Sequence, residues 1–401
     1  NPWSIHFSRI AHEASLGPFF YFLLLYLYYD LLHASKKSKS WIIAGIVLGI
    51  SFYTYQASWL MNPLLILLMG VIFYKETKKK YKQLFLSLAI GFVLFFPILS
   101  THFLFPEPGM ESRLSEVSIF NYPDAIVKII ENYFYYFSPD FLLLKGDELV
   151  FTFPGNARLY GEFHLYLIVL LVPSVLLLIL HSIQQKTLRR EILLLLGLVI
   201  LYPIPASLTN PSGWALRGYT VFPAFHIIAG LGLMWFLFRF KQISEKKMLQ
   251  VATSLIIAGV VLFQSVFFLY NYYTKYPKQP SNYLSYHYGI KESVQYIQTH
   301  KEKYDKIFIS GRINQPFIYI LFYTSYDPVK YHSIKKIIDP THWGWVYEFE
   351  KYVFIDEEQM PLGRKGSLFM VSGSPPIKGN KPLHQVMSPD ESRILFTIWE
   401  F

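Results

Sequence analysis

The sequence predicts a polytopic α-helical membrane protein with a small α/β domain at its C-terminal end. Of its 401 residues, 53% are hydrophobic and only 16% are charged, which is too apolar for an ordinary soluble enzyme. Long apolar segments recur as far as Tyr270, and the rest of the chain has mixed charge and short β-like runs. We therefore expect a membrane domain over residues 1–273 and a second domain over residues 274–401.

Eight apolar segments approach the roughly 20 residues that a helix needs to cross a bilayer. They are Leu16–Leu32, Trp41–Ser58, Leu60–Tyr74, Leu84–Phe105, Phe163–Leu180, Ile192–Leu208, Tyr219–Phe238 and Leu249–Tyr270. The second and third are barely separated, and Pro63 fits a tight reversal there, so one re-entrant hairpin is the alternative for this pair. The count of about eight spans is thus the expected architecture.

Basic residues gather in every second connection between these segments. The connections are His33–Ser40, Lys75–Lys82, Ser182–Glu191 and Arg239–Lys247. The positive-inside rule assigns all four to the cytoplasm of a multi-pass protein in the cytoplasmic membrane. The N-terminal stretch, the loop Pro106–Glu162 and everything after Asn271 then face outward. The formal charge of +10 is explained by this topology, so we expect no nucleic-acid partner.

The outer loop Pro106–Glu162 has the opposite charge bias, with nine acidic and four basic residues. Its aromatic run Tyr133–Phe137 and the apolar patch Phe141–Leu144 indicate a part that lies in the membrane interface. An aromatic belt without a specific ligand is the alternative for the tyrosines.

The C-terminal part has the elements of an α/β or α+β domain. Ser293–His300 predicts a helix, and Ile318–Tyr323 predicts a second apolar element. Strands are expected at Lys306–Ser310, Tyr352–Ile355, Ser367–Ser372 and Ile394–Trp399. About 120 residues is enough for one small domain.

Several chemistries are excluded or disfavoured by what the sequence lacks. It has no cysteine, so thiolate metal sites and cysteine nucleophiles are excluded. It has no P-loop, HExxH or GxSxG pattern in the right context, which weakens nucleotide-driven and hydrolase interpretations.

Gly45 and Gly49 form a GxxxG-like pair, which predicts close packing between spans.

Polar side chains collect at the segment ends that we expect to face outward. The stretch NPWSIHFSRIAHEASL contains Arg9, His12 and Glu13. A helix would place Arg9 and Glu13, four residues apart, on one face where they can interact. Later segments and the outer loop add Tyr55, Gln56, Arg113, Asn210 and Arg217.

Such a group suits an anionic phosphate or pyrophosphate with a polar substituent. The planar donors of Arg217 match phosphate oxygens, while a snorkelling arginine at the membrane boundary is the alternative. For Arg9 and Glu13 the alternative is an inert ion pair worth about 0–1 kcal/mol. His12 and Glu13 would point to different helix faces, so a metal site made from this chain alone is not expected.

The segments NPWSIHFSRIAHE and WIIAGIVLGISFYTYQASWL resemble integral-membrane glycosyltransferases of the GT-C fold. The most similar group is glycosyltransferase family 39, which includes protein O-mannosyltransferases and the aminoarabinose transferase of lipid A. FSPDFLLLKGD and PIPASLT…ALR resemble the same group, and the likeness covers most of residues 1–273.

The resemblance implies transfer of a sugar from a polyprenyl-phosphate donor to a lipid, glycan or protein acceptor on the outer face. It matches Arg9 and Glu13 to an arginine and an acid at the catalytic centre, and Glu13 would be the ligand if a divalent cation (Mg²⁺ or Mn²⁺) takes part. Arg217 matches an arginine that holds the lipid phosphate. Relatives often carry histidine three residues before it, where this chain has Trp214.

The remaining candidates are expected around the substrate; they are Tyr55, Gln56, Asn210, His12 and Arg113. The catalytic carboxylate of the resembled enzymes lies in their first external loop. This chain begins after that region, so we expect a truncated or processed chain whose main base lies upstream of Asn1. A transporter or flippase of lipid-linked sugars is the alternative function, although the span interiors carry few charges. A membrane-anchored binding module is a third.

Overall fold

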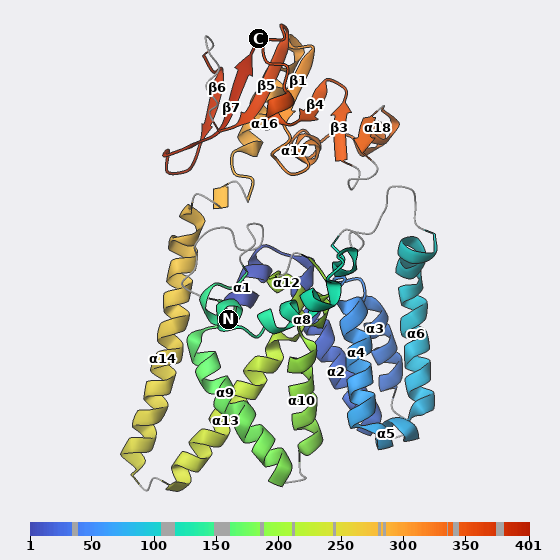
Figure 1. Cartoon of the computed structure of the whole chain (residues 1–401), viewed down its shortest axis with the longest axis vertical. Coiled ribbons are helices and arrows are strands. Elements are labelled where there is room, and N and C mark those ends of the chain that lie inside the picture. Colours follow the sequence, from blue (N-terminus) through green and yellow to red (C-terminus); the bar gives the residue numbers. More distant parts are fainter. Residues whose placement is uncertain are drawn as a thin grey trace. The chain divides into compact units, whose positions relative to one another are not determined.

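The computed structural model describes residues 1–33, 39–105, 117–147, 161–184, 188–210, 213–243, 246–279, 282–283, 286–334, 336–339, 345–373 and 381–401. The chain divides into two compact units, the first running to Tyr272 and the second from Tyr273 to Phe401 (Figure 1). Each is described by itself. Arg113 and the rest of residues 106–116 lie outside the described residues.

The regular elements in the described residues of unit 1 are helices, apart from one antiparallel bridge between Ser118 and Thr209. Its N-terminal part consists of α1 (Pro2–Arg9), η1 (Glu13–Leu16), α2 (Gly17–His33), α3 (Ser40–Ser51), α4 (Ser58–Ile72), α5 (Tyr74–Lys79), α6 (Tyr81–Leu99) and η2 (Ser100–Leu104). Its later part consists of η3 (Ile119–Asn121), α8 (Ala125–Tyr135), η4 (Asp140–Leu144), α9 (Leu165–Gln184), α10 (Arg189–Leu201), α11 (Ile204–Ser207), α12 (Ala215–Gly218), η5 (Tyr219–Val221), α13 (Phe222–Ile243) and α14 (Lys247–Thr274).

Five helical stretches among the described residues are long and apolar enough to cross a membrane. They are Glu13–His33, Tyr81–His102, Arg189–Ser207, Ala215–Ile243 and Lys247–Lys278. Three expected spans are represented by shorter apolar helices, Ser40–Ser51, Ser58–Ile72 and Leu165–His181. The expected count of about eight spans is therefore not confirmed; five candidate spans are present among the described residues, and these apolar helices indicate a membrane protein.

The surface of unit 1 fits a bilayer better than it fits water. On α14 the side chains Leu255, Ile256, Leu262 and Phe263 are 65–68% exposed. A contiguous apolar surface of this extent is unusual in a soluble monomer and is the expected surface in lipid. A helix of 28 residues is about 42 Å long, which exceeds the hydrocarbon thickness.

The two ends of unit 1 differ in charge. One end, called here the basic end, contains α5, the ends of α9 and α13 and the starts of α10 and α14 (Figure 1). Basic residues lie in α5 and near these helix ends, namely Lys75, Lys78, Lys79, Arg189, Arg190, Arg239, Lys241 and Lys247. The opposite end, called here the site end, contains α1, α8 and α12 (Figure 1). The charge asymmetry expected from the sequence is thus a property of the fold.

Glycines allow the close packing of α3 on α6. A Cβ atom added at Gly45 would lie 2.6 Å from the carbonyl oxygen of Ser87, and one at Gly49 would lie 2.4 Å from Leu94 Cβ. On α6, a Cβ at Gly91 would lie 2.6 Å from a side-chain carbon of Leu48. The packing role predicted for Gly45 and Gly49 is therefore confirmed.

Unit 2 is an α/β domain with a seven-stranded sheet in the order β2-β3-β4-β1-β5-β7-β6. The strands are β1 (Lys306–Ser310), β2 (Lys336–Asp339), β3 (Trp345–Phe349), β4 (Tyr352–Ile355), β5 (Ser367–Ser372), β6 (His384–Met387) and β7 (Ile394–Glu400). Strand β1 pairs in parallel with β4 and β5, and the other described pairings are antiparallel. Its helices are η6 (Tyr276–Lys278), α16 (Ile290–His300), η7 (Lys301–Lys303), α17 (Pro316–Tyr323), α18 (Pro328–Ser333) and η8 (Glu357–Gln359).

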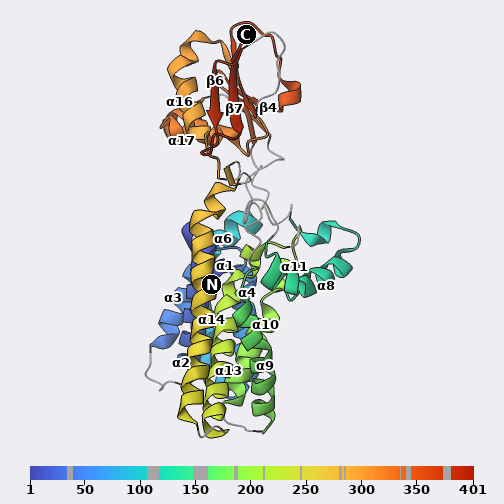
Figure 2. The same cartoon turned by 90° about the vertical axis from the view of Figure 1, so that its left-hand side faces the viewer.

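Successive side chains of β1 point to opposite faces of this sheet and pack into the core on each face. Ile307 and Ile309 join the core under α16 and α17, whereas Phe308 joins a second core with Met360 and Phe369. Figure 2 shows α16 and α17 on the same side of the sheet. The helix, the apolar element and the four strands predicted from the sequence are all present.

Candidate functional site

The N-terminal helix α1 is fastened into the site end of unit 1 by Trp3. The side chain of Asn1 caps the helix by accepting a hydrogen bond from the Trp3 N–H at 3.0 Å. The Trp3 side chain is fully buried, and its ring centroid lies 5.5 Å from Phe163 and 5.7 Å from Tyr219. Tyr219 follows Arg217 by two residues, so α1 and α12 are neighbours.

The prediction that Arg9 and Glu13 lie on one face of a single helix is wrong. Helix α1 ends at Arg9, Ala11 has the left-handed φ of 52°, and Glu13 begins a separate 3₁₀ helix. The left-handed residue interrupts the 3.6-residue repeat that would have placed the two side chains on one face. Glu13 instead lies beside His12, with Oε2 3.1 Å from Nδ1, and its side chain is 62% exposed.

Arg9 points to a different partner. Its guanidinium carbon lies 5.2 Å from the ring centroid of Tyr272, near the end of α14. The hydroxyl of the same tyrosine lies 3.0 Å from Nδ1 of His6, which is fully buried. Arg9 and His6 therefore join α1 to α14 at the site end.

His12 is close to one of the predicted substrate-binding residues. The Tyr55 ring, in the connection between α3 and α4, lies 5.9 Å from the His12 ring in an edge-to-face arrangement. Nδ1 of His12 accepts the Ala14 N–H at 3.2 Å when the ring is neutral, and the contact with Glu13 becomes an ion pair when that nitrogen is protonated. Gln56 follows Tyr55 and is half-buried.

Arg217 is held by the loop that precedes it. Its Nη1 donates to the hydroxyl of Thr209 at 2.6 Å, and its guanidinium carbon lies 5.0 Å from the ring centroid of Trp214. Asn210, next to Thr209, donates through Nδ2 to the hydroxyl of Tyr122 at 2.6 Å. Arg217 thus contacts the residue next to Asn210, and a shared role of the two in a substrate site stays a prediction.

A pair of buried carboxylates near Arg217 was not singled out from the sequence. Asp147 Oδ2 accepts the N–H of Ala215, the first residue of α12, at 2.9 Å. The N–H of Asp147 in turn donates to Glu162 Oε1 at 2.8 Å. Both side chains are buried, so this pair fixes the start of the short helix that contains Arg217.

Glu162 is in an environment that disfavours its charged form. Burial is the largest cause and the nearby negative charge of Asp147 the next, and together they raise the pKa of the Glu162 carboxyl well above its usual range. Gly146 allows the close approach, because a Cβ there would lie 2.9 Å from Glu162 Oε1 and its φ is +65°. The one feature of the sequence that could have pointed to this pair is the dipeptide Gly146-Asp147, which follows an apolar run and predicts a turn.

Tyr136 connects α8 to the same region. Its hydroxyl donates to the carbonyl of Trp214 at 3.1 Å, and its own carbonyl accepts a hydrogen bond from the Tyr202 hydroxyl. The ring is fully buried, and it faces Phe141 at 4.7 Å between centroids. Residues 117–147 therefore contact the segment with Arg217 through Tyr122, Tyr136 and Asp147.

The described residues do not gather a metal centre. No group of three or more His, Asp or Glu side chains that could hold a metal ion occurs among them. Glu13 contributes one exposed carboxylate beside His12, whereas Mg²⁺ and Mn²⁺ favour several oxygen ligands. We therefore derive no chemical step through a metal.

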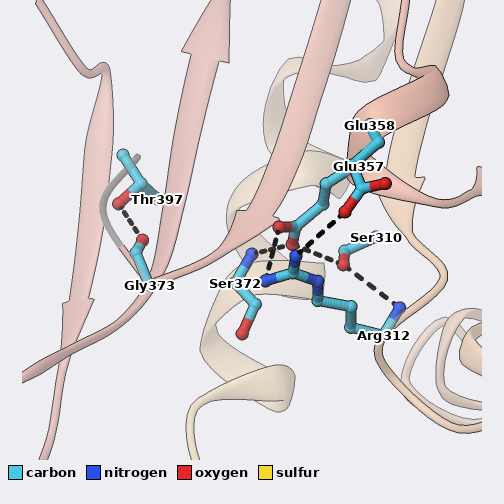
Figure 3. A network of polar contacts seen from close by, with 7 residues as sticks. All are labelled: Ser310, Arg312, Glu357, Glu358, Ser372, Gly373 and Thr397. Atoms are coloured by element: carbon cyan, nitrogen blue, oxygen red, sulfur yellow. Dashed lines mark hydrogen bonds and ion pairs between the residues drawn. The ribbon is translucent and has the colours of Figure 1, made fainter. Parts of the chain in front are cut away.

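Unit 2 has a polar network where β1, β4 and β5 end (Figure 3). Glu357 Oε1 accepts hydrogen bonds from the Ser310 hydroxyl and the Ser372 N–H, both at 2.6 Å. Arg312 pairs with Glu357 at 3.4 Å and with Glu358 at 3.8 Å. Ligands often bind outside the carboxyl ends of parallel strands. Here the polar groups satisfy one another, so the network joins three strand ends and is not a candidate site.

The chain has no match among protein-family models, curated proteins or solved structures.

Proposed function

We propose that the protein is a membrane glycosyltransferase that moves a sugar from a polyprenyl-phosphate donor to an acceptor on the outer face of the membrane. The observation that carries this proposal is the placement of Arg217. It belongs to α12, which lies at the end of unit 1 opposite the basic end, where the positive-inside rule predicts the outer side (Figure 1). A donor of this class has its phosphate at that level and its apolar tail in the bilayer.

The surroundings of Arg217 suit a phosphate leaving group. The guanidinium is held by Thr209 and by the ring of Trp214, and the Asp147 carboxylate fixes the start of its helix. When the bond between the sugar and the phosphate oxygen breaks, negative charge grows on the phosphate. A preorganised arginine stabilises that charge more strongly than it stabilises the ground state.

The other half of the reaction needs a base for the acceptor hydroxyl. Its oxygen attacks the sugar carbon while a carboxylate takes the proton, which leaves polyprenyl phosphate and a glycosylated acceptor. Arg9, His12, Glu13 and Tyr55 lie at the site end and form the remaining candidates for donor or acceptor contacts.

The test is a transfer assay in proteoliposomes. The chain, with any sequence that precedes Asn1 in the natural protein, is reconstituted with radiolabelled polyprenyl-phosphate sugars, mannose first. We expect Arg217→Ala to lower transfer by about 100-fold, the usual cost of removing a donor to a developing charge. Arg217→Lys should retain part of the rate, because it keeps the charge and loses the planar fork.

Arg239→Ala is the matched control. Arg239 also lies over a tryptophan, with its guanidinium carbon 5.4 Å from the ring centroid of Trp235, but it is near the basic end. The Arg239→Ala variant should transfer sugar at the wild-type rate. A wild-type rate for Arg217→Ala would refute the site. Passage of the labelled lipid across the bilayer without transfer to any acceptor would favour the flippase alternative.

A further inference from the structure

Helix α8 exposes an apolar face at the site end of unit 1. Ile126, Ile130 and Phe134 are 75%, 52% and 65% exposed, and Val127 is 56% exposed. The first three are spaced at i, i+4 and i+8, so all four side chains share one side of the helix. Exposed apolar side chains in such a row indicate a surface that something other than water covers.

The opposite side of α8 is attached to the helices of unit 1. Asn132 and Tyr136, which follows the helix, lie buried on this side, and the Tyr136 hydroxyl donates to the carbonyl of Trp214. Tyr133 lies at the edge of the apolar face, and its hydroxyl donates to the carbonyl of Ile200 in α10 at 2.9 Å. The orientation of the exposed face is therefore fixed by these contacts.

Glu131 and Tyr133 border the apolar face, and Lys128 lies on the other side of the helix. Lys128 pairs with Asp124 at 2.9 Å, and its ammonium lies 3.9 Å from the centroid of the Tyr122 ring. Glu131 is exposed on the next turn. An apolar face with a carboxylate and a tyrosine along its border, and a lysine on the other side of the helix, is the pattern of a helix that lies flat at a membrane surface.

Two observations identify lipid as the occupant. Ile200, whose carbonyl receives the Tyr133 hydrogen bond, is itself 58% exposed on α10, a candidate span. The apolar face of α8 is thus attached beside the exposed apolar surface of that span. Both views show α8 running across the direction of the bundle helices, at the level where they end (Figures 1 and 2).

We propose that α8 is embedded in the lipid–water interface of the outer leaflet, with Ile126, Val127, Ile130 and Phe134 in the acyl chains. Lys128 and Glu131 then face the headgroups. This role differs from the interfacial role first predicted for the aromatic run, because Tyr133 and Tyr136 contact the protein. The proposal rests on the exposed face and does not depend on the transfer reaction.

The absence of cysteine makes the test direct, because any single cysteine introduced is the only one in the chain. Ile126→Cys, Ile130→Cys and Phe134→Cys, with Lys128→Cys and Glu131→Cys, are spin-labelled and reconstituted in phosphatidylcholine–phosphatidylglycerol vesicles. Collision rates are measured with oxygen, which concentrates in lipid, and with a water-soluble nickel chelate. Leu262→Cys on α14 is the lipid benchmark, and Glu358→Cys in unit 2 is the water benchmark.

We expect the oxygen-to-nickel ratio at positions 126, 130 and 134 to approach that of Leu262→Cys and to be several-fold higher than at positions 128 and 131. A high nickel collision rate at all five positions would refute the proposal, because the helix would then be in water. Low collision rates with both reagents at 126, 130 and 134 would also refute it, because a protein surface would cover the face. The two benchmarks set, in the same experiment, the oxygen-to-nickel ratio of a lipid-facing position and of a water-exposed position.

Discussion

Glu162 shows how much of the candidate site depends on contacts between residues far apart in the chain. Its carboxylate accepts the Asp147 N–H, and Asp147 caps a helix that begins 68 residues later, at Ala215. The sequence shows which residues are acidic but not which of them are buried. Gly146-Asp147 predicts a turn, and nothing in the sequence pairs that turn with α12.

The environment of Glu162 gives stability a specific pH dependence. Its pKa is raised in the folded protein, so between the ordinary value of 4.5 and the raised value the folded state holds a proton that the unfolded state has released. Stability then falls as the pH rises, by at most about 1.4 kcal/mol per pH unit for this group. Glutamine is neutral throughout and keeps an oxygen for the Asp147 N–H.

We therefore expect Glu162→Gln to be close to wild type in thermal stability at pH 5 and increasingly more stable than wild type as the pH rises towards the raised pKa of Glu162. The measurement is the unfolding midpoint in detergent across this range. Glu131→Gln, at an exposed position on α8, is the control and should show no growing advantage. A constant difference between Glu162→Gln and wild type at all pH values would contradict the raised pKa.

At the scale of elements, the sequence predicted helix positions better than helix breaks. Ala11 has a left-handed backbone that its residue type does not favour, so the separation of α1 from η1 could not be read from local propensity. Tertiary packing of Trp3 and His6 holds α1 in place, and Arg9 consequently contacts Tyr272 and not Glu13.

Glycine packing between α3 and α6 was predictable, because small residues four apart on an apolar helix have few other uses. We expect Gly45→Ala to destabilise the protein by about 1–3 kcal/mol, because the new Cβ would meet the backbone oxygen of Ser87, which cannot rotate away. Gly259→Ala on α14 is the matched control, since no atom lies within 4 Å of its added Cβ.

Gly259→Ala should leave the free energy of unfolding unchanged or raise it by up to about 1 kcal/mol, because alanine is a better helix former than glycine. Thermal unfolding of both variants in the same detergent measures the difference. Equal stability of Gly45→Ala and Gly259→Ala would mean that α3 and α6 can separate without cost.

For the whole molecule, strands with strong apolar character were found from the sequence and weaker ones were not. β1 and β5 lie inside the sheet and read as short apolar runs. β2 and β6 are its edge strands, with only four residues each, and Ile337 and Ile338 of β2 are exposed. Edge strands bury little, so their sequences are under less constraint and give a weaker signal.

The membrane topology determines on which side of the bilayer the basic loops, the candidate site and unit 2 lie. Helix α14 begins at Lys247 near the basic end, and Tyr272 near its other end contacts His6 of α1. We therefore expect the chain beyond α14 to begin on the side of the membrane that holds the site end. If the basic end is cytoplasmic, both the site and unit 2 are extracytoplasmic.

Labelling from one side of the membrane tests this topology in the cysteine-free chain. A membrane-impermeant maleimide should label Asn121→Cys at the site end and Glu358→Cys in unit 2 on intact cells. Lys79→Cys, on α5, should react only after the cells are permeabilised. Reaction of Lys79→Cys in intact cells would reverse the orientation and place Arg217 towards the cytoplasm, where a donor on the outer face could not reach it. Opposite behaviour of Asn121→Cys and Glu358→Cys would show that α14 does not cross the membrane, because that helix is the connection between their two units.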